Sequence, residues 1–200
     1  MNTSDEIAAS AATWIVEHGL DYSAACRKAA DHLGLAGIRG IAMPDHLRVE
    51  DAVREHLALF FADTQPAELR ALRELAAQWM QRLQEFQPYV GGAVWRGTAS
   101  ARSPILLDLY TDDPTGPELT LINLGVPFET GQRSGRGREP VPVIGLEMPC
   151  PAIHDTVPIE ISVWPHDDLR GALKPDARGH SWRGTLPALL QRLREDNAHD

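Results

Sequence analysis

The segment from residue 91 to residue 110 holds the residues whose types and spacing best suit chemistry on a phosphate. It begins with the pair Gly91 and Gly92, passes through an Arg-Gly-Thr turn, and ends in an apolar run that contains one acid, Asp108. Glycines let the backbone come close enough to a triphosphate for main-chain amides to bind its oxygens. The alternative for the glycine pair is a bulge or a close strand crossing. Because a carboxylate in an apolar strand is costly to bury unless it is paired, Asp108 is expected either to line a pocket or to be a hydrogen-bonded structural acid.

The elements that must position this segment can be read from the hydrophobic periodicity. The first 87 residues have helical spacing, and the strongest pattern is a long amphipathic helix that Pro66 opens at its first turn. From residue 88 the pattern becomes strand-like, with strands expected at 90–96, 105–110, 127–130, 141–147 and 157–164. Short helices are expected after residues 113, 166 and 186. Helices followed by alternating strands and short helices predict an α+β fold, with a helical segment at 1–87 and a mixed-sheet domain at 88–200.

Composition limits the classes of function. The chain of 200 residues is 43% hydrophobic and 24% charged, as in an ordinary globular protein, and its net charge is −9. An acidic chain is a poor general nucleic-acid binder, because neutralising phosphates needs a basic face. No segment approaches the ~20 apolar residues of a membrane span, and no secretory signal pattern begins the chain. We therefore expect a cytoplasmic protein with no membrane contact. Cys26 and Cys150 are too far apart in sequence to indicate a zinc site or a disulfide framework.

A family resemblance rests on five features in order. They are the long amphipathic helix, a strand that ends in Gly-Gly, the sequence Arg96-Gly97-Thr98-Ala99, a linker that ends in Ser, and a second apolar strand. Together they resemble the nucleotidyltransferase superfamily, whose fold is that of polymerase-β-like and antibiotic-modifying nucleotidyltransferases. This likeness covers about residues 88–165. A divergent proteobacterial group of proteins of about this length is similar over nearly the whole chain, from Glu17-His-Gly-Leu-Asp-Tyr to the segment 168–179.

The resemblance implies a mixed sheet of nucleotidyltransferase type and roles for particular residues. Gly91 and Gly92 would contact the phosphates of an NTP through their amides, and Arg96 would touch a nucleotide phosphate. An arginine at a strand end also commonly faces solvent or pairs with a local acid, so both readings of Arg96 stay open. Asp108 and Glu160 would be the catalytic acids and would hold metal. Carboxylates on neighbouring strands can hold the Mg²⁺ ions that stabilise the attacking and leaving oxygens. Mg²⁺ is therefore the expected cofactor if the protein is active.

The sequence departs from the superfamily pattern at its centre. Alignment on the Arg-Gly-Thr-Ala sequence puts Pro104 and Leu106 where the two strand carboxylates would lie, and neither side chain binds metal. Asp108 lies two residues further along the same strand face, a displacement of ~6.6 Å. Mg²⁺ demands near-ideal octahedral geometry, so such a displacement matters. The sequence therefore favours a degenerate metal site over an active one.

These observations leave two functions open. The first is a nucleotidyltransferase-like protein that, if active, moves a nucleoside monophosphate from an NTP to an acceptor. The second is a non-catalytic nucleotide-sensing or protein-interaction module, with a protein partner or a homo-oligomer. Arg133, Arg136 and Arg138 either clamp phosphates or belong to a solvated hairpin connection. The chain has no G-x-x-x-x-G-K-[ST] sequence, which argues against a P-loop ATPase and a Mur-type ATP-dependent ligase.

Overall fold

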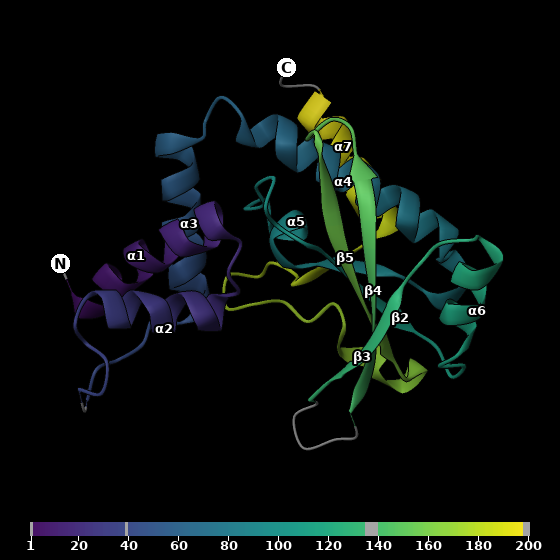
Figure 1. The fold of residues 1–200 in the computed structure, drawn as a ribbon, viewed down its shortest axis with the longest axis horizontal. Coiled ribbons are helices and arrows are strands. Elements are labelled where there is room, and N and C mark those ends of the chain that lie inside the picture. Colours follow the sequence, from purple (N-terminus) through teal and green to yellow (C-terminus); the bar gives the residue numbers. More distant parts are fainter. Residues whose placement is uncertain (1, 39, 135–139, 198–200) are drawn as a thin grey trace.

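The computed structural model describes residues 2–38, 40–134 and 140–197 and shows an α+β fold with a helical N-terminal segment (Figure 1). The helices are α1 (Thr3–His18), α2 (Tyr22–His32), α3 (His46–Phe60), α4 (Gln65–Arg82), α5 (Gly92–Arg96), α6 (Gly116–Asn123) and α7 (Leu186–Asn197), with 3₁₀ turns η1 (Gln84–Phe86) and η2 (His166–Gly171). The strands are β1 (Tyr89–Gly91), β2 (Ile105–Tyr110), β3 (Glu129–Arg133), β4 (Val141–Cys150), β5 (Asp155–Trp164) and β6 (Arg183–Thr185).

In the described part of the chain, six strands form one mixed sheet in the order β3-β4-β5-β2-β1-β6. The central pair, β2 and β5, is parallel, whereas the other neighbouring strands are antiparallel. In the parallel pair Asp108 is opposite Ser162, and Leu106 is opposite Glu160. Because partners across a ladder and residues two apart along a strand share a face, all of these side chains belong to one face of the sheet.

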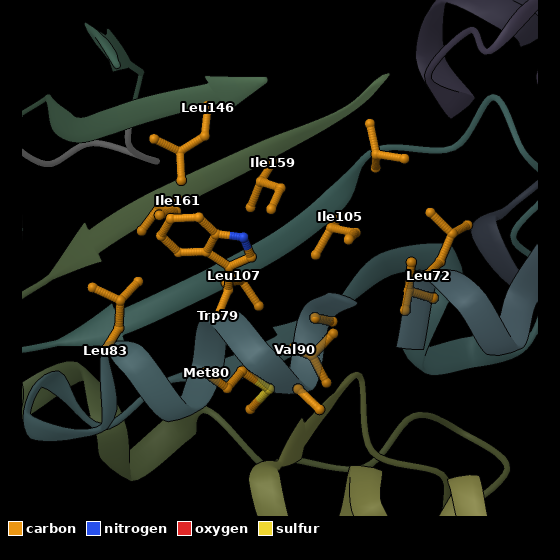
Figure 2. Close-up of a cluster of buried hydrophobic side chains, with 14 of the residues drawn as sticks. Leu72, Trp79, Met80, Leu83, Val90, Ile105, Leu107, Leu146, Ile159 and Ile161 are labelled. Atoms are coloured by element: carbon orange, nitrogen blue, oxygen red, sulfur yellow. The ribbon is translucent and has the colours of Figure 1, made fainter. Parts of the chain in front are cut away.

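The opposite face of the sheet carries the hydrophobic core. Its buried residues come from alternate positions of the strands and contact α4 and α7. Figure 2 shows Trp79 of α4 directed onto the strand residues Leu107, Ile159 and Ile161. Trp79 is 1% exposed, so this contact removes almost the whole indole from water. One side of the sheet is therefore closed by helices, and the polar side is left to form a site.

The helices α1, α2 and α3 have a hydrophobic core of their own, with buried residues from Ile7 to Leu57. They lie together on one side of the molecule, next to the N-terminus (Figure 1). In contrast, the buried residues of α4 from Leu69 onward belong to the core of the sheet. Packing thus changes from one core to the other between α3 and α4, earlier than the boundary predicted at residues 87 and 88, and that domain boundary stays a prediction.

Two local details differ from the sequence-based expectation. The strand predicted at 90–96 ends at Gly91, and residues Gly92–Arg96 form α5 instead. Gly92 begins this helix at a φ of +59°, and a Cβ there would lie 2.9 Å from Cδ1 of Leu106. A side chain is therefore disfavoured at this bend by the backbone conformation and would also require Leu106 to shift. The structure also adds β6 at the edge of the sheet, which the pattern did not predict.

A search of the described residues for a long, strongly apolar helix that could cross a membrane found none.

Candidate functional site

A cleft of about 1760 Å³ lies over the polar face of the sheet. This is larger than the roughly 300–1,000 Å³ of common small-molecule pockets, so a nucleotide-sized ligand has room. The predicted residues Gly91, Gly92, Asp108 and Glu160 all line it. The structure therefore brings the glycine bend and both predicted acids into a single cleft. Arg96 is not among the described residues that line the cleft.

Asp108 lines the cleft with both carboxylate oxygens engaged. Its Oδ1 accepts a hydrogen bond of 2.6 Å from Nε1 of Trp164, and its Oδ2 accepts one from Nε of Arg183 on β6. The Asp108 side chain is 13% exposed. Burial alone would lower the pKa of Arg183, but the Asp108 carboxylate outweighs burial and raises it. The Asp108–Arg183 pair is thus a fixed, charge-assisted contact.

Tyr110 follows Asp108 on β2 and is affected by the same carboxylate. Burial, reinforced by the negative charge of Asp108, raises the pKa of Tyr110 to about 12. The phenol therefore stays protonated near neutral pH and is a poor proton acceptor there.

Glu160 occupies a more open position in the cleft. Its Oε1 lies 3.3 Å from Nη1 of Arg133 on β3, and the same nitrogen donates a 3.0 Å hydrogen bond to Oγ of Ser162. The Arg133 and Glu160 side chains are 50% and 42% exposed. Solvent screens such a pair, and exposed pairs are typically worth about 0–1 kcal/mol. Arg133 can therefore leave Glu160 for another anion at little cost.

These contacts make the two acids a poor site for Mg²⁺. Each carboxylate already has a guanidinium partner, and Asp108 has the Trp164 indole as well. Within residues 2–38, 40–134 and 140–197, no three His, Cys, Asp or Glu side chains are grouped so that they could hold a metal ion. Leu106, which is opposite Glu160, supplies an apolar side chain where a further acid would be needed. The residues present do not fit the Mg²⁺ that the resemblance implies.

Arg96 lies instead in a buried ion cluster between α3, α5 and the segment before β6. Its guanidinium donates to Glu50 at 2.8 and 3.0 Å and to Oδ2 of Asp176 at 2.8 Å. The side chains of Arg96, Glu50 and Asp176 are 8%, 3% and 1% exposed. Burial alone would lower the pKa of Arg96, but these two carboxylates raise it. Of the two readings of Arg96, the structure supports pairing with acids, although its partners are distant in sequence.

Sequence reasoning missed Arg183, Trp164 and Trp182 as cleft residues. Arg183 begins a strand of only three residues, Arg183–Thr185, and Trp182 directly precedes it. A strand this short has no period-two pattern that would reveal it. Trp164 ends a strand that the pattern did predict, but its partner Asp108 is 56 residues away. Of the three loop arginines weighed as phosphate clamps, Arg133 lines the cleft, and Arg136 and Arg138 lie outside the described residues.

Comparison with known proteins does not assign the chain to a family. No protein-family model matches the chain, and no curated protein matches it either.

Proposed function

We propose that this is a nucleotidyltransferase-like protein whose metal site is degenerate, so that the cleft binds an NTP without transferring its nucleoside monophosphate. The observation that carries the proposal is the double engagement of Asp108 by Arg183 and Trp164. An acid held this way does not offer its oxygens to a metal ion. In this proposal the Arg183 guanidinium takes the place beside Asp108 that a metal ion would occupy and supplies the positive charge there.

Arg133 is the group best placed to bind the phosphates of the ligand. Its pair with Glu160 is exposed and weak, so a phosphate can replace the carboxylate. Guanidinium groups bind phosphate oxygens through two parallel, charge-assisted hydrogen bonds. The glycine bend offers a second approach, because Gly91 and Gly92 both line the cleft and have no side chains of their own. The proposal therefore places the phosphates between Arg133 and this bend.

Calorimetric titration with ATP, GTP, CTP and UTP, each in Mg²⁺ and in EDTA, tests this function. We expect at least one NTP to bind with the same affinity in both conditions and to release no pyrophosphate. Arg133→Ala should weaken binding, whereas Arg27→Ala, which removes an exposed arginine of α2, should not. Absence of binding by every NTP would refute nucleotide binding. Mg²⁺-dependent pyrophosphate release that Glu160→Gln abolishes would refute the degenerate site.

A second candidate function, self-association through the helical segment, is favoured by two exposed apolar side chains at the end of α3. Leu59 and Phe60 are 67% and 69% exposed. Adjacent exposed apolar groups of this size commonly mark contact surfaces. Sedimentation velocity should show association that Leu59→Ser combined with Phe60→Ser removes. A wild-type protein that is monomeric at every concentration contradicts this candidate.

A further inference from the structure

Trp182 lies at the wall of the cleft with one face of its indole already occupied. The Arg96 guanidinium stands over this ring, 4.7 Å from its centroid. His46 of α3 meets the ring edge-on at a centroid distance of 6.2 Å, and His46 also lines the cleft. Trp182 is only half-buried and lines the cleft, so part of its side chain is open to the cleft.

The Arg96 guanidinium that contacts the Trp182 ring is itself fixed by two carboxylates. Arg96 is fixed by Glu50 on one side and by Asp176 on the other, and all three side chains are almost fully buried. Burial alone would raise the pKa of Asp176, but backbone amides of His180 and Arg178 and the Arg96 guanidinium outweigh burial and lower it. Asp176 therefore stays charged near neutral pH. An ordered indole on a fixed cation loses little conformational freedom when a ligand packs on it.

A second aromatic layer supports His46. Its ring stacks on Tyr22 of α2 with a centroid distance of 4.7 Å and an interplanar angle of 29°. Burial, with Glu50 nearby, raises the pKa of Tyr22 to about 12, so this phenol stays neutral. Trp182 and His46 together make the end of the cleft beside β6 aromatic, whereas Arg133 on β3 and Glu160 and Ser162 on β5 make the part toward the opposite edge of the sheet polar.

We propose that Trp182 is the stacking platform for the planar ring of the ligand, and that Arg96 is the positioning residue that holds this platform. This inference rests on the proposed function and deepens it by assigning the base of the NTP to Trp182. The aromatic end would take the ring, and Arg133 would take the phosphates. Stacking tolerates different rings because every base has a π face, so we expect little preference among bases.

The test compares Trp182→Ala with Trp182→Phe, using ATP and inorganic tripolyphosphate in EDTA as calorimetric probes. Loss of the indole should weaken ATP binding by roughly tenfold to a hundredfold, the usual effect of removing a base-stacking side chain. It should leave tripolyphosphate binding unchanged, and Trp182→Phe should retain most of the affinity for ATP. Glu50→Gln, which loosens Arg96, should weaken ATP binding and again leave tripolyphosphate binding unchanged.

The outcomes separate this inference from the function on which it rests. If Trp182→Ala binds ATP as tightly as the wild type, the platform is refuted and nucleotide binding stands. If Trp182→Ala weakens ATP and tripolyphosphate equally, the indole shapes the cleft without stacking, and the platform is again refuted. If the wild type binds none of ATP, GTP, CTP and UTP, both the platform and the proposed function are refuted. Circular dichroism on each variant checks that the fold is retained.

Discussion

Two of the arginine–carboxylate clusters among the described residues differ mainly in their exposure to water. In the buried cluster, Arg96 joins Glu50 and Asp176, and each of these side chains is at most 8% exposed. In the open cluster, Arg133 joins Glu160, and both side chains are more than 40% exposed. The same chemical groups therefore hold segments together in one place and remain free to exchange partners in the other. Desolvation, rather than residue type, separates a structural contact from an exchangeable one.

Removal of Arg96 should have the largest effect on stability. Arg96→Met leaves Asp176 buried without its cation and Glu50 with Arg54 alone, and breaking a buried pair in this way typically costs about 3–5 kcal/mol. Urea unfolding followed by circular dichroism measures the change. Arg133→Met is the matched control, and equal losses in the two variants would contradict the distinction between the clusters.

Asp108→Asn should have a smaller effect on stability and an informative effect on binding. Hydrogen bonds to charged groups contribute about 1.5–3 kcal/mol, so losing the charge opposite Arg183 should lower the unfolding free energy by about that amount. Because the variant removes a negative charge from the cleft, NTP affinity should be unchanged or higher. Calorimetry checks the affinity, and abolished binding would contradict this expectation.

The buried cluster should also make the stability of the protein depend on pH in the acidic range. The pKa of Asp176 is lowered in the folded protein, so its contribution is fully present above the unfolded pKa of about 3.9 and is lost as pH falls through the folded value. The urea midpoint of the wild type should therefore fall as pH drops below about 4. Asp176→Asn should start from a lower midpoint and lose less of it over that range. A variant with the same acid dependence as the wild type would contradict this assignment.

The smallest effect on stability is expected at the open cluster. Arg133→Ala should change the unfolding free energy by about 0–1 kcal/mol, because an exposed pair contributes little. Its melting temperature, measured by calorimetry, should stay close to that of the wild type. A large loss would mean that the bond from Arg133 to Ser162 is structural.

Much of the fold could be predicted because its elements have strong local signals. The run Ile105–Tyr110 was predicted as a strand with its observed bounds, and the stripe of α4 predicted Trp79 as core. Alternation along the two predicted strands also places Asp108 on the same face as residues 104 and 106, and Glu160 on the same face as Ser162. The start of α5 was missed because the apolar residues 93–95 suit a strand as well as a helix, and the left-handed bend at Gly92 decides between them.

The partners in the candidate site could not be predicted from sequence. The sequence predicts that Asp108 is either an acid lining a pocket or a hydrogen-bonded structural acid. In the structure it both lines the cleft and is hydrogen-bonded. Its partner Arg183 is 75 residues away, and the Glu50 and Asp176 partners of Arg96 are 46 and 80 residues away. Sequence patterns report local periodicity, whereas these pairs depend on how the helical segment and the final strand pack against the sheet.

Binding of Mn²⁺ to the protein alone tests the central claim most directly, because Mn²⁺ prefers the same oxygen ligands as Mg²⁺ and can be followed by electron paramagnetic resonance. We predict that the protein leaves the signal of free Mn²⁺ unchanged, since Arg183 and Trp164 already occupy the Asp108 carboxylate. Stoichiometric binding of Mn²⁺ that is lost in both Asp108→Asn and Glu160→Gln would contradict the account.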